Sequence, residues 1–301
     1  MLDTERLRAR SDFFQAVRSF FLHRGYLEVD TPLRLPTLIP EAYIVPVTSG
    51  DWFLHTSPEL CMKRLLAHGA EKLFQLCHCF RGEESGRLHQ PEFTMLEWYR
   101  VGWNYHDLMQ ECEELFGWLA TRQRGWAAVH QGCLRRDGKE VELAVPWQRL
   151  SVEEAFERYS SMELRTALSL GCFDEVLVEE VEPHLGRERP VFLVDYPVEL
   201  GALARRKPGD SRFVERFELY CCGIELANGF SELIDPAEQR DRFLREMSIQ
   251  SKEYALPEKF LDDLHLLEEC AGIAVGADRL LMLLQGARHL DDVIPFTQTD
   301  L

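Results

Sequence analysis

The segment Phe80–Tyr99, FRGEESGRLHQPEFTMLEWY, concentrates side chains that can bind charged ligands: arginine, glutamate, histidine and tyrosine. Residues 73–80 and 93–101 have the composition of two strands, and the polar residues 81–92 form the loop between them. Guanidinium, imidazole and carboxylate groups next to one hairpin indicate a site for a ligand that carries charges of both signs.

The second strand of this hairpin divides its residues between two faces. With a period of two, Phe93, Glu97 and Tyr99 share one face, and the other positions are apolar apart from a threonine. The apolar face suits a core. Arg81 and Glu83 add charge to the first face, which is costly to bury without a ligand. A solvated sheet face is the alternative explanation.

A second cluster is acidic and lies in FELYCCGIELANGFSEL. Gly223 permits a turn, so Glu218 and Glu225 are expected to lie across a hairpin from each other, with Glu232 further along. Paired carboxylates are the oxygen ligands that Mg²⁺ prefers, usually together with phosphate oxygens. Spaced surface glutamates are the alternative, but Asn228 and its apolar neighbours are unusual in a solvated strand.

The third element is GIAVGADRLLML, residues 272–283. Gly276 allows a close approach of backbone to ligand where a strand passes into a helix. Arg279 falls in the first helical turn, where the helix N-terminus favours an anion. The spacing matches neither a Rossmann nor a P-loop fingerprint.

The elements that position these residues mix antiparallel hairpins with separate helices, which indicates an α+β fold and one domain over residues 1–301. Ser11 and Gly25 are expected to cap and end the first helix. Further elements are predicted as strands 26–29, 213–220, 224–228 and 273–275, and as helices from 57 to 69, from 235 and from 277 to 286, with 104–190 mainly helical.

Composition limits the possible partners. The 301 residues are 46% hydrophobic and carry a net charge of −17, with no secretory signal and no apolar run long enough for a membrane helix. A cytoplasmic protein is therefore expected, with no membrane role. The net negative charge disfavours tRNA as a ligand and favours a protein partner that has a basic surface. The basic run 205–207 is expected to be a solvated loop, with contact to phosphate or a partner as the alternative.

Nine cysteines are scattered along the chain, and Cys77 and Cys79 flank His78. In a strand the two cysteines share a face that His78 leaves, so these three cannot easily converge on a metal. Buried reduced thiols are the expected state.

Together the segments resemble the three signature motifs of class II aminoacyl-tRNA synthetases. The first helix, strand and Pro32 resemble motif 1, Phe80 to Phe93 resembles motif 2, and Gly276 to Arg279 resembles motif 3. TSPEL, FRGEE, HQPEFTMLEWY and GIELANGFSEL resemble lysyl-tRNA synthetases most, and specifically their short paralogues that attach lysine or β-lysine to elongation factor P. Two features depart from the full synthetases: motif 1 begins too early for an anticodon-binding domain, and Ala274 stands where they usually have glycine.

The resemblance implies a role for each candidate residue, with ATP and Mg²⁺ as cofactors. Arg81 and Arg279 are the implied catalytic residues, and Glu218 and Glu225 the metal ligands. The implied ATP-binding residues are Arg81, Glu83, His89, Gln90, Phe93, Glu225, Leu226, Gly276 and Arg279. The implied amino-acid pocket comprises Ser57, Glu59, Glu97, Tyr99, Asn228, Glu232 and Ala274.

The expected function is therefore activation of lysine or β-lysine as an adenylate and its transfer to a lysine of elongation factor P, by a homodimer. Two alternatives remain open. One is a minimal lysyl-tRNA synthetase that uses a separate tRNA-binding subunit. The other is a non-catalytic regulator that binds amino acid or ATP, which should have lost the motif arginines or metal carboxylates that this chain keeps.

Overall fold

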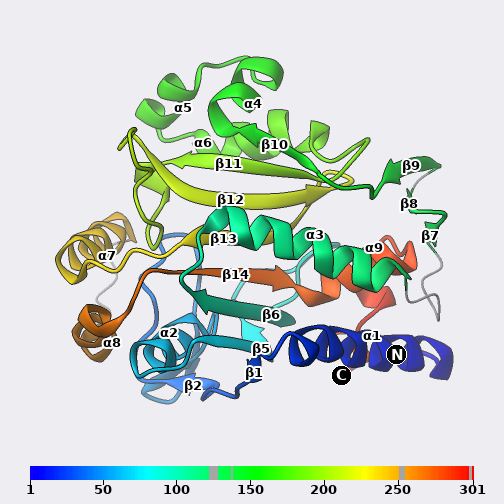
Figure 1. Ribbon diagram of the computed structural model, residues 1–301, viewed down its shortest axis with the longest axis horizontal. Helices are drawn as coiled ribbons and strands as arrows, with labels where there is room; N and C mark the ends of the chain where they lie inside the picture. The colour runs from blue at the N-terminus through cyan, green and yellow to red at the C-terminus, as the bar shows by residue number, and fades with distance from the viewer. Residues whose placement is uncertain (122–127, 137, 251–254, 298–299) are drawn as a thin grey trace.

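A computed structural model describes residues 1–121, 128–136, 138–250, 255–297 and 300–301. Its central feature is an eight-stranded sheet in the order β1-β5-β6-β14-β13-β12-β11-β10 (Figure 1). These strands are β1 (Leu27–Glu28), β5 (Lys72–Phe80), β6 (Glu92–Val101), β10 (Gln148–Ser151), β11 (Val191–Pro197), β12 (Phe213–Cys221), β13 (Ile224–Ser231) and β14 (Cys270–Gly276).

Neighbouring strands in the middle of the sheet are antiparallel, and only its two outer pairs, β1 with β5 and β10 with β11, are parallel. The β5–β6 hairpin pairs Lys72 with Arg100 at one end and Phe80 with Glu92 at the other. The predicted hairpin and the predicted α+β class are confirmed.

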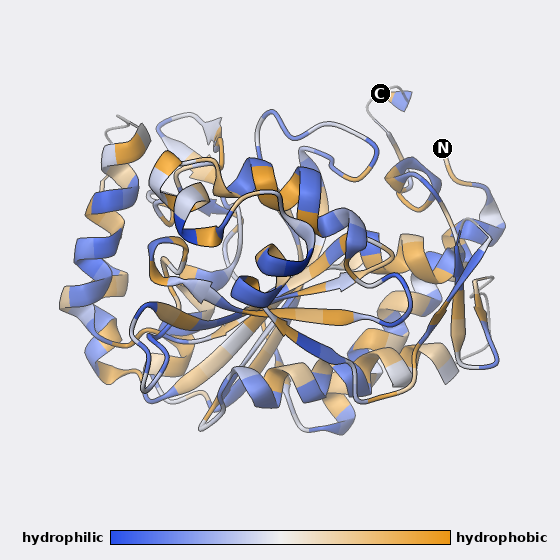
Figure 2. Cartoon of the chain, turned by 90° about the horizontal axis from the view of Figure 1, so that it is seen from above, coloured by the Kyte–Doolittle hydropathy of each residue, from blue (hydrophilic) through white to orange (hydrophobic). Residues whose placement is uncertain are grey.

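The sheet separates two hydrophobic cores. On one side, Leu96 and Trp98 are fully buried against α1 (Thr4–His23), α3 (Tyr105–Thr121) and α9 (Ala277–Gln285). Tyr99 and Phe230 point to the other side, where the second core includes α2 (Glu59–Ala67). That side also carries α4 (Val152–Tyr159), α5 (Leu164–Leu170), α6 (Phe173–Val176), α7 (Pro236–Gln250) and α8 (Glu258–Asp263). Figure 2 shows hydrophobic strands inside and helices of mixed polarity around them.

The first helix starts earlier than predicted. It begins at Thr4, because the Asp3 side chain accepts a hydrogen bond from the Arg6 backbone N–H and caps the helix. Ser11 lies within the helix, where its hydroxyl accepts a hydrogen bond from Gln15. The predicted N-cap at Ser11 was therefore wrong. Asp3 and Ser11 can both cap a helix, and the apolar stripe begins only after Ser11, which made the later residue look like the cap.

Residues 104–190 are less helical than predicted. After α3 they include a small separate sheet of β7 (Val129–His130), β8 (Cys133–Arg136) and β9 (Lys139–Glu142), then β10. These strands are only two to four residues long, which is too short for a period of two to be recognised in the sequence. A third sheet consists of β2 (Arg34–Leu35), β3 (Val47–Ser49) and β4 (Trp52–Leu54).

Short helical turns complete the described elements. They are η1 (Leu177–Val181), η2 (Glu182–His184), η3 (Val198–Leu200), η4 (Leu264–Leu266) and η5 (Leu290–Asp292). Within the described ranges, no helix combines the length and apolarity needed to cross a bilayer.

Candidate active site

A cavity of about 390 Å³ opens beside the β6, β14 and β13 strands, under the loop that joins β5 to β6. Most of the residues predicted to bind ATP or metal line it, although they come from three distant segments. The predicted residues in its lining are Arg81, His89, Gln90, Phe93, Glu218, Glu225, Leu226, Asn228, Ala274, Gly276 and Arg279. These segments come together because β14 pairs with β6 on one side and with β13 on the other.

Arg81 lies at the start of the β5–β6 loop with its guanidinium 5.2 Å from the centre of the Phe93 ring. Its Nε is buried and has no hydrogen-bond partner among the described residues. The nearest carboxylate is Glu84, at 3.8 Å from Nη1. Because a buried donor without an acceptor is unfavourable, this arrangement suits an incoming anion.

Arg279 links its own segment to the β5–β6 loop and to Glu225. Its Nη1 donates to the Glu225 carbonyl oxygen at 3.0 Å and contacts the Glu225 carboxylate at 3.2 Å, and its Nε donates to the Leu88 carbonyl oxygen at 3.1 Å. Its Nη2 lies 2.7 Å from Nε2 of His89. Burial and the positive charge of Arg279 lower the pKa of His89, so this imidazole is neutral and can accept that hydrogen bond.

The loop residues are not all turned into the cavity. Gln90 donates from Nε2 to Asp291 at 2.9 Å. Glu83 is exposed, has a φ of 65°, and lies outside the cavity lining, where Glu84 is found instead. A contact between Glu83 and adenine therefore requires the loop to rearrange when nucleotide binds.

Glu218 and Glu225 share the cavity but are not directly opposite. Glu218 pairs with Asn228, and Glu225 pairs with Tyr220 on the other side of a bulge between Leu219 and Tyr220. The predicted hairpin that carries the two glutamates is confirmed, and both residues line the cavity.

Glu218 is held by three donors. Its carboxylate accepts hydrogen bonds from the hydroxyls of Tyr196 and Tyr220 at 2.5 and 2.7 Å, and pairs with Arg216 at 2.5 Å. Burial raises the pKa of Glu218, with Arg216 opposing this effect and Glu225 adding to it. Glu182 is nearby and was not predicted; burial raises its pKa to about 7.

This donor set fits a hard divalent cation. Glu218 and Glu225 both line the cavity, and Glu218 Oε1 and Glu225 Oε2 each accept one hydrogen bond, so each retains a lone pair. A cation there would also relieve the repulsion between the two carboxylates that contributes to the raised pKa of Glu218.

A second compartment, here called the acidic pocket, comprises Glu59, Lys63, Glu97, Tyr99 and Glu232. All five residues are buried, and Glu97 and Glu232 are each 1% exposed. The pocket lies on the same face of the sheet as the cavity, because Glu97 and Tyr99 alternate with core residues along β6. This cluster contains four of the seven residues of the implied amino-acid pocket, namely Glu59, Glu97, Tyr99 and Glu232.

Lys63 is the member that the sequence analysis missed. Its ammonium lies between Glu59, at 2.5 Å, and Glu232. Burial would lower the pKa of Lys63, but the two carboxylates raise it above its ordinary value. The spacing of four residues between Glu59 and Lys63 in a predicted helix was the available signal.

The carboxyl group of Glu232 can bind a further partner. Its Oε1 is buried without a hydrogen-bond partner among the described residues, whereas Oε2 contacts Lys63. Burial raises the pKa of Glu232 to about 8, with Lys63 opposing and Glu59 adding to the shift. A buried acceptor with no donor is costly, which indicates a place for a cationic ligand group.

Glu97 is held in a fixed position. The Ser57 hydroxyl donates to its Oε2 at 2.8 Å and the Tyr99 hydroxyl to its Oε1 at 2.5 Å. Burial and the negative charge of Glu59 raise the pKa of Glu97 well above its ordinary value. Ser57 also accepts from the Glu59 backbone N–H at 3.0 Å and so positions the start of α2.

Small residues on β14 make room between these groups. A methyl group added at Gly272 would lie 2.1 Å from the Tyr99 ring and 2.7 Å from Glu232 Oε1, so only glycine fits there. The next residue on this face, Ala274, stands between Asn228 of β13 and Glu97 of β6 and lines the cavity. Its methyl group therefore lies between the cavity and the acidic pocket.

Glu41 connects the two compartments and was also missed. It lines the cavity, and its carboxyl is close enough to both Arg81 and Glu59 for each charge to act on it. Burial raises the pKa of Glu41 to about 7, with Arg81 opposing. Glu41 lies in an irregular segment, where no periodic pattern marks a side chain as facing the site.

The comparisons with known proteins agree with this architecture. Residues 3–300 match the family described as tRNA synthetases class II (D, K and N), which defines the class of protein. The elongation factor P–(R)-β-lysine ligase of Pectobacterium carotovorum subsp. carotovorum (strain PC1) is 38% identical over 315 residues, covering 97% of this chain and 94% of its own. The ligase of the same name from Baumannia cicadellinicola subsp. Homalodisca coagulata is 35% identical over 316 residues, with 97% and 94% covered. The chain therefore belongs to the elongation factor P–(R)-β-lysine ligase family of class II synthetase domains.

Proposed function

We propose that this chain activates lysine or β-lysine with ATP as an aminoacyl-adenylate and transfers it to a lysine side chain of elongation factor P. Its relatives are named as ligases of elongation factor P and (R)-β-lysine, and class II synthetase-like ligases use ATP. The observation that carries the proposal is the acidic pocket, which holds more carboxyl groups than cations, beside a cavity lined by three arginines.

The charge balance favours a diamine. Three carboxyl groups, Glu59, Glu97 and Glu232, face one ammonium, Lys63, so there are more carboxyl groups than cations of the protein to pair with them. Lysine and β-lysine each bring two ammonium groups and one carboxylate. Glu59 would bind the amine nearer the substrate carboxylate, and Glu232 with Tyr99 the distal one. Asn228 and Glu97 would orient these groups, and Ser57 would hold Glu97 in place.

The nucleotide would occupy the cavity. Arg81, with its unpaired Nε, would bridge the α-phosphate and the substrate carboxylate. Phe93 and Arg279 would sandwich the adenine by stacking and by cation–π contact. His89 and Gln90 would contact the outer phosphates. Glu83 would reach the adenine edge after the loop rearranges, and Leu226 and Gly276 would complete the nucleotide site.

Glu218 and Glu225 would hold Mg²⁺. The ion would neutralise phosphate charge and stabilise the leaving pyrophosphate. Tyr196, Tyr220 and Arg216 keep the Glu218 carboxylate in place for this role.

The chemistry requires no covalent nucleophile from the protein. The substrate carboxylate attacks the α-phosphorus while Arg81 and Arg279 balance the growing negative charge, so positioning and electrostatics supply the rate. The buried acidic pocket fixes the amines and excludes water from the adenylate. The neutral ε-amine of the acceptor lysine then attacks the adenylate carbonyl; an amide bond forms, the acyl–phosphate bond breaks, AMP leaves and the nitrogen loses a proton.

The wider setting is also part of the proposal. We infer one catalytic domain over residues 1–301 that acts in the cytoplasm as a homodimer, by resemblance to motif 1. The net charge of −17 favours a protein acceptor over tRNA, because a polyanion is repelled at long range.

The test measures pyrophosphate exchange with lysine and with (R)-β-lysine, followed by mass spectrometry of elongation factor P. Exchange with either isomer and a matching mass increase on one acceptor lysine would support the proposal. Charging of tRNA without modification of elongation factor P would favour the minimal synthetase. Binding of amino acid without any exchange would favour the regulator.

A further inference from the structure

Two cysteines and a histidine meet beside the acidic pocket, although they come from different segments. Cys77 and Cys79 share the cavity face of β5, and His55 lies in the segment that precedes α2. The two Sγ atoms are 3.9 Å apart, and Cys79 Sγ is 3.9 Å from His55 Nε2. The three potential ligand atoms all lie within 4.8 Å of one another.

These separations are close to those of a tetrahedral zinc site. With Zn–S bonds of about 2.3 Å, two sulfurs on one ion are about 3.8 Å apart, and a sulfur and an imidazole nitrogen about 3.6 Å apart. Two thiolates and one imidazole leave a fourth position for a further ligand. Met95 Sδ, 3.8 Å from Cys79 Sγ, adds a soft donor on the same side.

Buried thiols can also serve only as small packing groups, and the neighbourhood of His55 argues against that explanation. His55 and Cys79 are both fully buried. Among the described residues, His55 Nδ1 has no hydrogen-bond partner, and Nε2 contacts the His78 carbonyl oxygen at 2.7 Å as well as Cys79 Sγ at 3.9 Å. A small rotation can exchange the hydrogen bond to His78 for a bond to a metal. His78 itself points away and pairs with Glu92.

We propose that His55, Cys77 and Cys79 form a Zn²⁺ site. The ion would link β5 to the segment that carries Ser57 and Glu59, which lie two and four residues after His55. Zinc would therefore clamp one wall of the acidic pocket against the sheet. The influence on amino-acid binding rests on the proposed function, but the binding of metal does not.

The first test titrates the metal-free, reduced protein with Co²⁺ as a spectroscopic substitute for Zn²⁺. One Co²⁺ per chain should bind with a thiolate charge-transfer band and tetrahedral visible bands, and one equivalent of Zn²⁺ should bleach both. Cys79→Ser and, separately, Cys77→Ser should weaken binding by more than the roughly 100-fold that loss of an outer-shell partner can cost. Cys133→Ser, in β8, should bind as the unchanged chain does.

A Co²⁺ spectrum without a thiolate band, or one that Cys77→Ser and Cys79→Ser leave unchanged, would overturn the zinc site. The second test follows hydrogen exchange of the 55–59 backbone with and without Zn²⁺, which needs no activity. Slower exchange on Zn²⁺ addition, lost in Cys79→Ser, is expected from a clamp. Equal exchange in both states would overturn the clamp. A failed pyrophosphate exchange beside a positive Co²⁺ spectrum would refute only the enzymatic proposal.

Discussion

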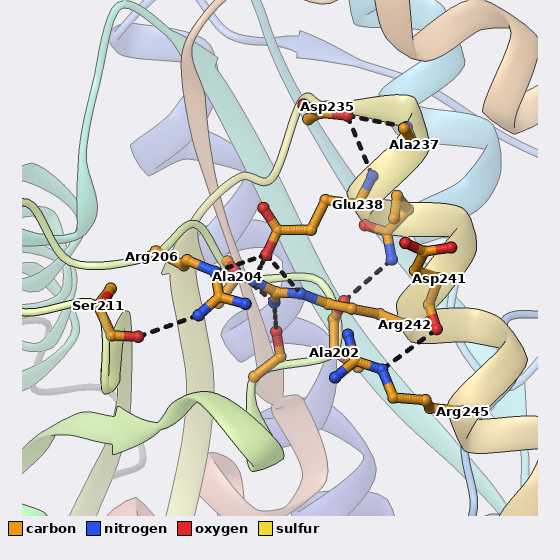
Figure 3. A network of polar contacts seen from close by, with 12 residues as sticks. Ala202, Ala204, Arg206, Ser211, Asp235, Ala237, Glu238, Asp241, Arg242 and Arg245 are labelled. Carbon is orange, nitrogen blue, oxygen red and sulfur yellow. Dashed lines mark hydrogen bonds and ion pairs between the residues drawn. The ribbon is translucent and has the colours of Figure 1, made fainter.

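Lys63 and Arg242 are both buried cations, but the balance of positive and negative groups around them differs. Arg242, in α7, is 4% exposed and donates to Glu238 and to the carbonyl oxygens of Gly201 and Ala204 (Figure 3). Glu238 also accepts from Arg206 at 2.8 Å. This group, here called the α7 network, matches two guanidinium groups to one carboxylate and several backbone carbonyls.

The acidic pocket has the opposite balance. It holds three carboxylates for one ammonium, and Glu232 Oε1 has no partner within the described residues. The pKa values show the same contrast: Arg242 and Arg206 hold the pKa of Glu238 below its ordinary value although burial opposes them, whereas burial raises that of Glu232 to about 8. A matched network stabilises the fold, and an unmatched one indicates a place for a ligand of the missing charge.

The largest expected effect is on the unmatched side. Glu232→Gln should strongly lower lysine-dependent pyrophosphate exchange, because it removes the buried negative charge that would bind an ammonium group. Loss of one partner in a buried charge pair costs about 2–5 kcal/mol, which is roughly 30- to 4,000-fold in kcat/KM for lysine. Binding of ATP, followed by a fluorescent analogue, should remain.

The matched control is Glu238→Gln in the α7 network. It carries the same change of charge on a glutamate that pairs with arginines, and it should leave the KM for lysine unchanged. Equal losses of exchange in the two variants would remove Glu232 from the amine role.

The next effect is on stability. Arg242→Ala should lower the free energy of unfolding by about 2–4 kcal/mol, because Glu238 loses one of its two arginine partners and two carbonyl oxygens lose a charged donor. Urea denaturation measures the change. Arg240→Ala, which removes an exposed pair with Glu258, is the control and should change stability little. If both variants were equally stable, the α7 network would not stabilise the fold as its contacts indicate.

The difference between the two regions could only partly be predicted from the sequence. The period of two in β6 placed Glu97 and Tyr99 on one face, and a helix placed Arg279 near its N-terminus, because both rules are local. The pairing of Glu232 with Lys63 joins residues 169 positions apart in the chain and depends on tertiary packing. Arg205, Arg206 and Lys207 looked like a solvated run, but all three pair with acidic residues of this chain.

The pH dependence provides a smaller test. In the free enzyme Glu232 carries a proton below about pH 8, and an ammonium group requires the ionised form. As the pH rises toward about 8, the KM for lysine should therefore fall by up to about tenfold per pH unit. Above that pH it should level off. Burial also raises the pKa of Glu41 and of Glu182 to about 7, so the Glu232→Gln variant is needed to assign the dependence to Glu232. Glu232→Gln should lose this dependence, and a KM flat between about pH 6 and 9 in the unchanged chain would contradict it.

The raised pKa of Glu232 also predicts that the stability of the unliganded protein depends on pH, in the direction opposite to that of lysine binding. The folded-state pKa of Glu232 is raised from 4.5 to about 8, so its contribution to stability is fully present below the unfolded pKa. That contribution is lost as the pH rises through about 8, when the unliganded pocket must hold another negative charge. Thermal unfolding with saturating lysine should remove much of this loss, because the ligand supplies the missing cations.

The smallest expected effect concerns Ala274, whose methyl group lies between Asn228 and Glu97. Ala274→Gly enlarges the space near the substrate carboxylate without changing any charge, so it should alter the preference between lysine and β-lysine while leaving exchange intact. One methyl group gives about 1–3 kcal/mol of discrimination at most, and a partly open cavity should give the lower end, roughly fivefold to tenfold in the ratio of kcat/KM values. Pyrophosphate exchange with both isomers measures that ratio. An unchanged ratio would show that charge matching in the acidic pocket, and not its shape, selects the isomer.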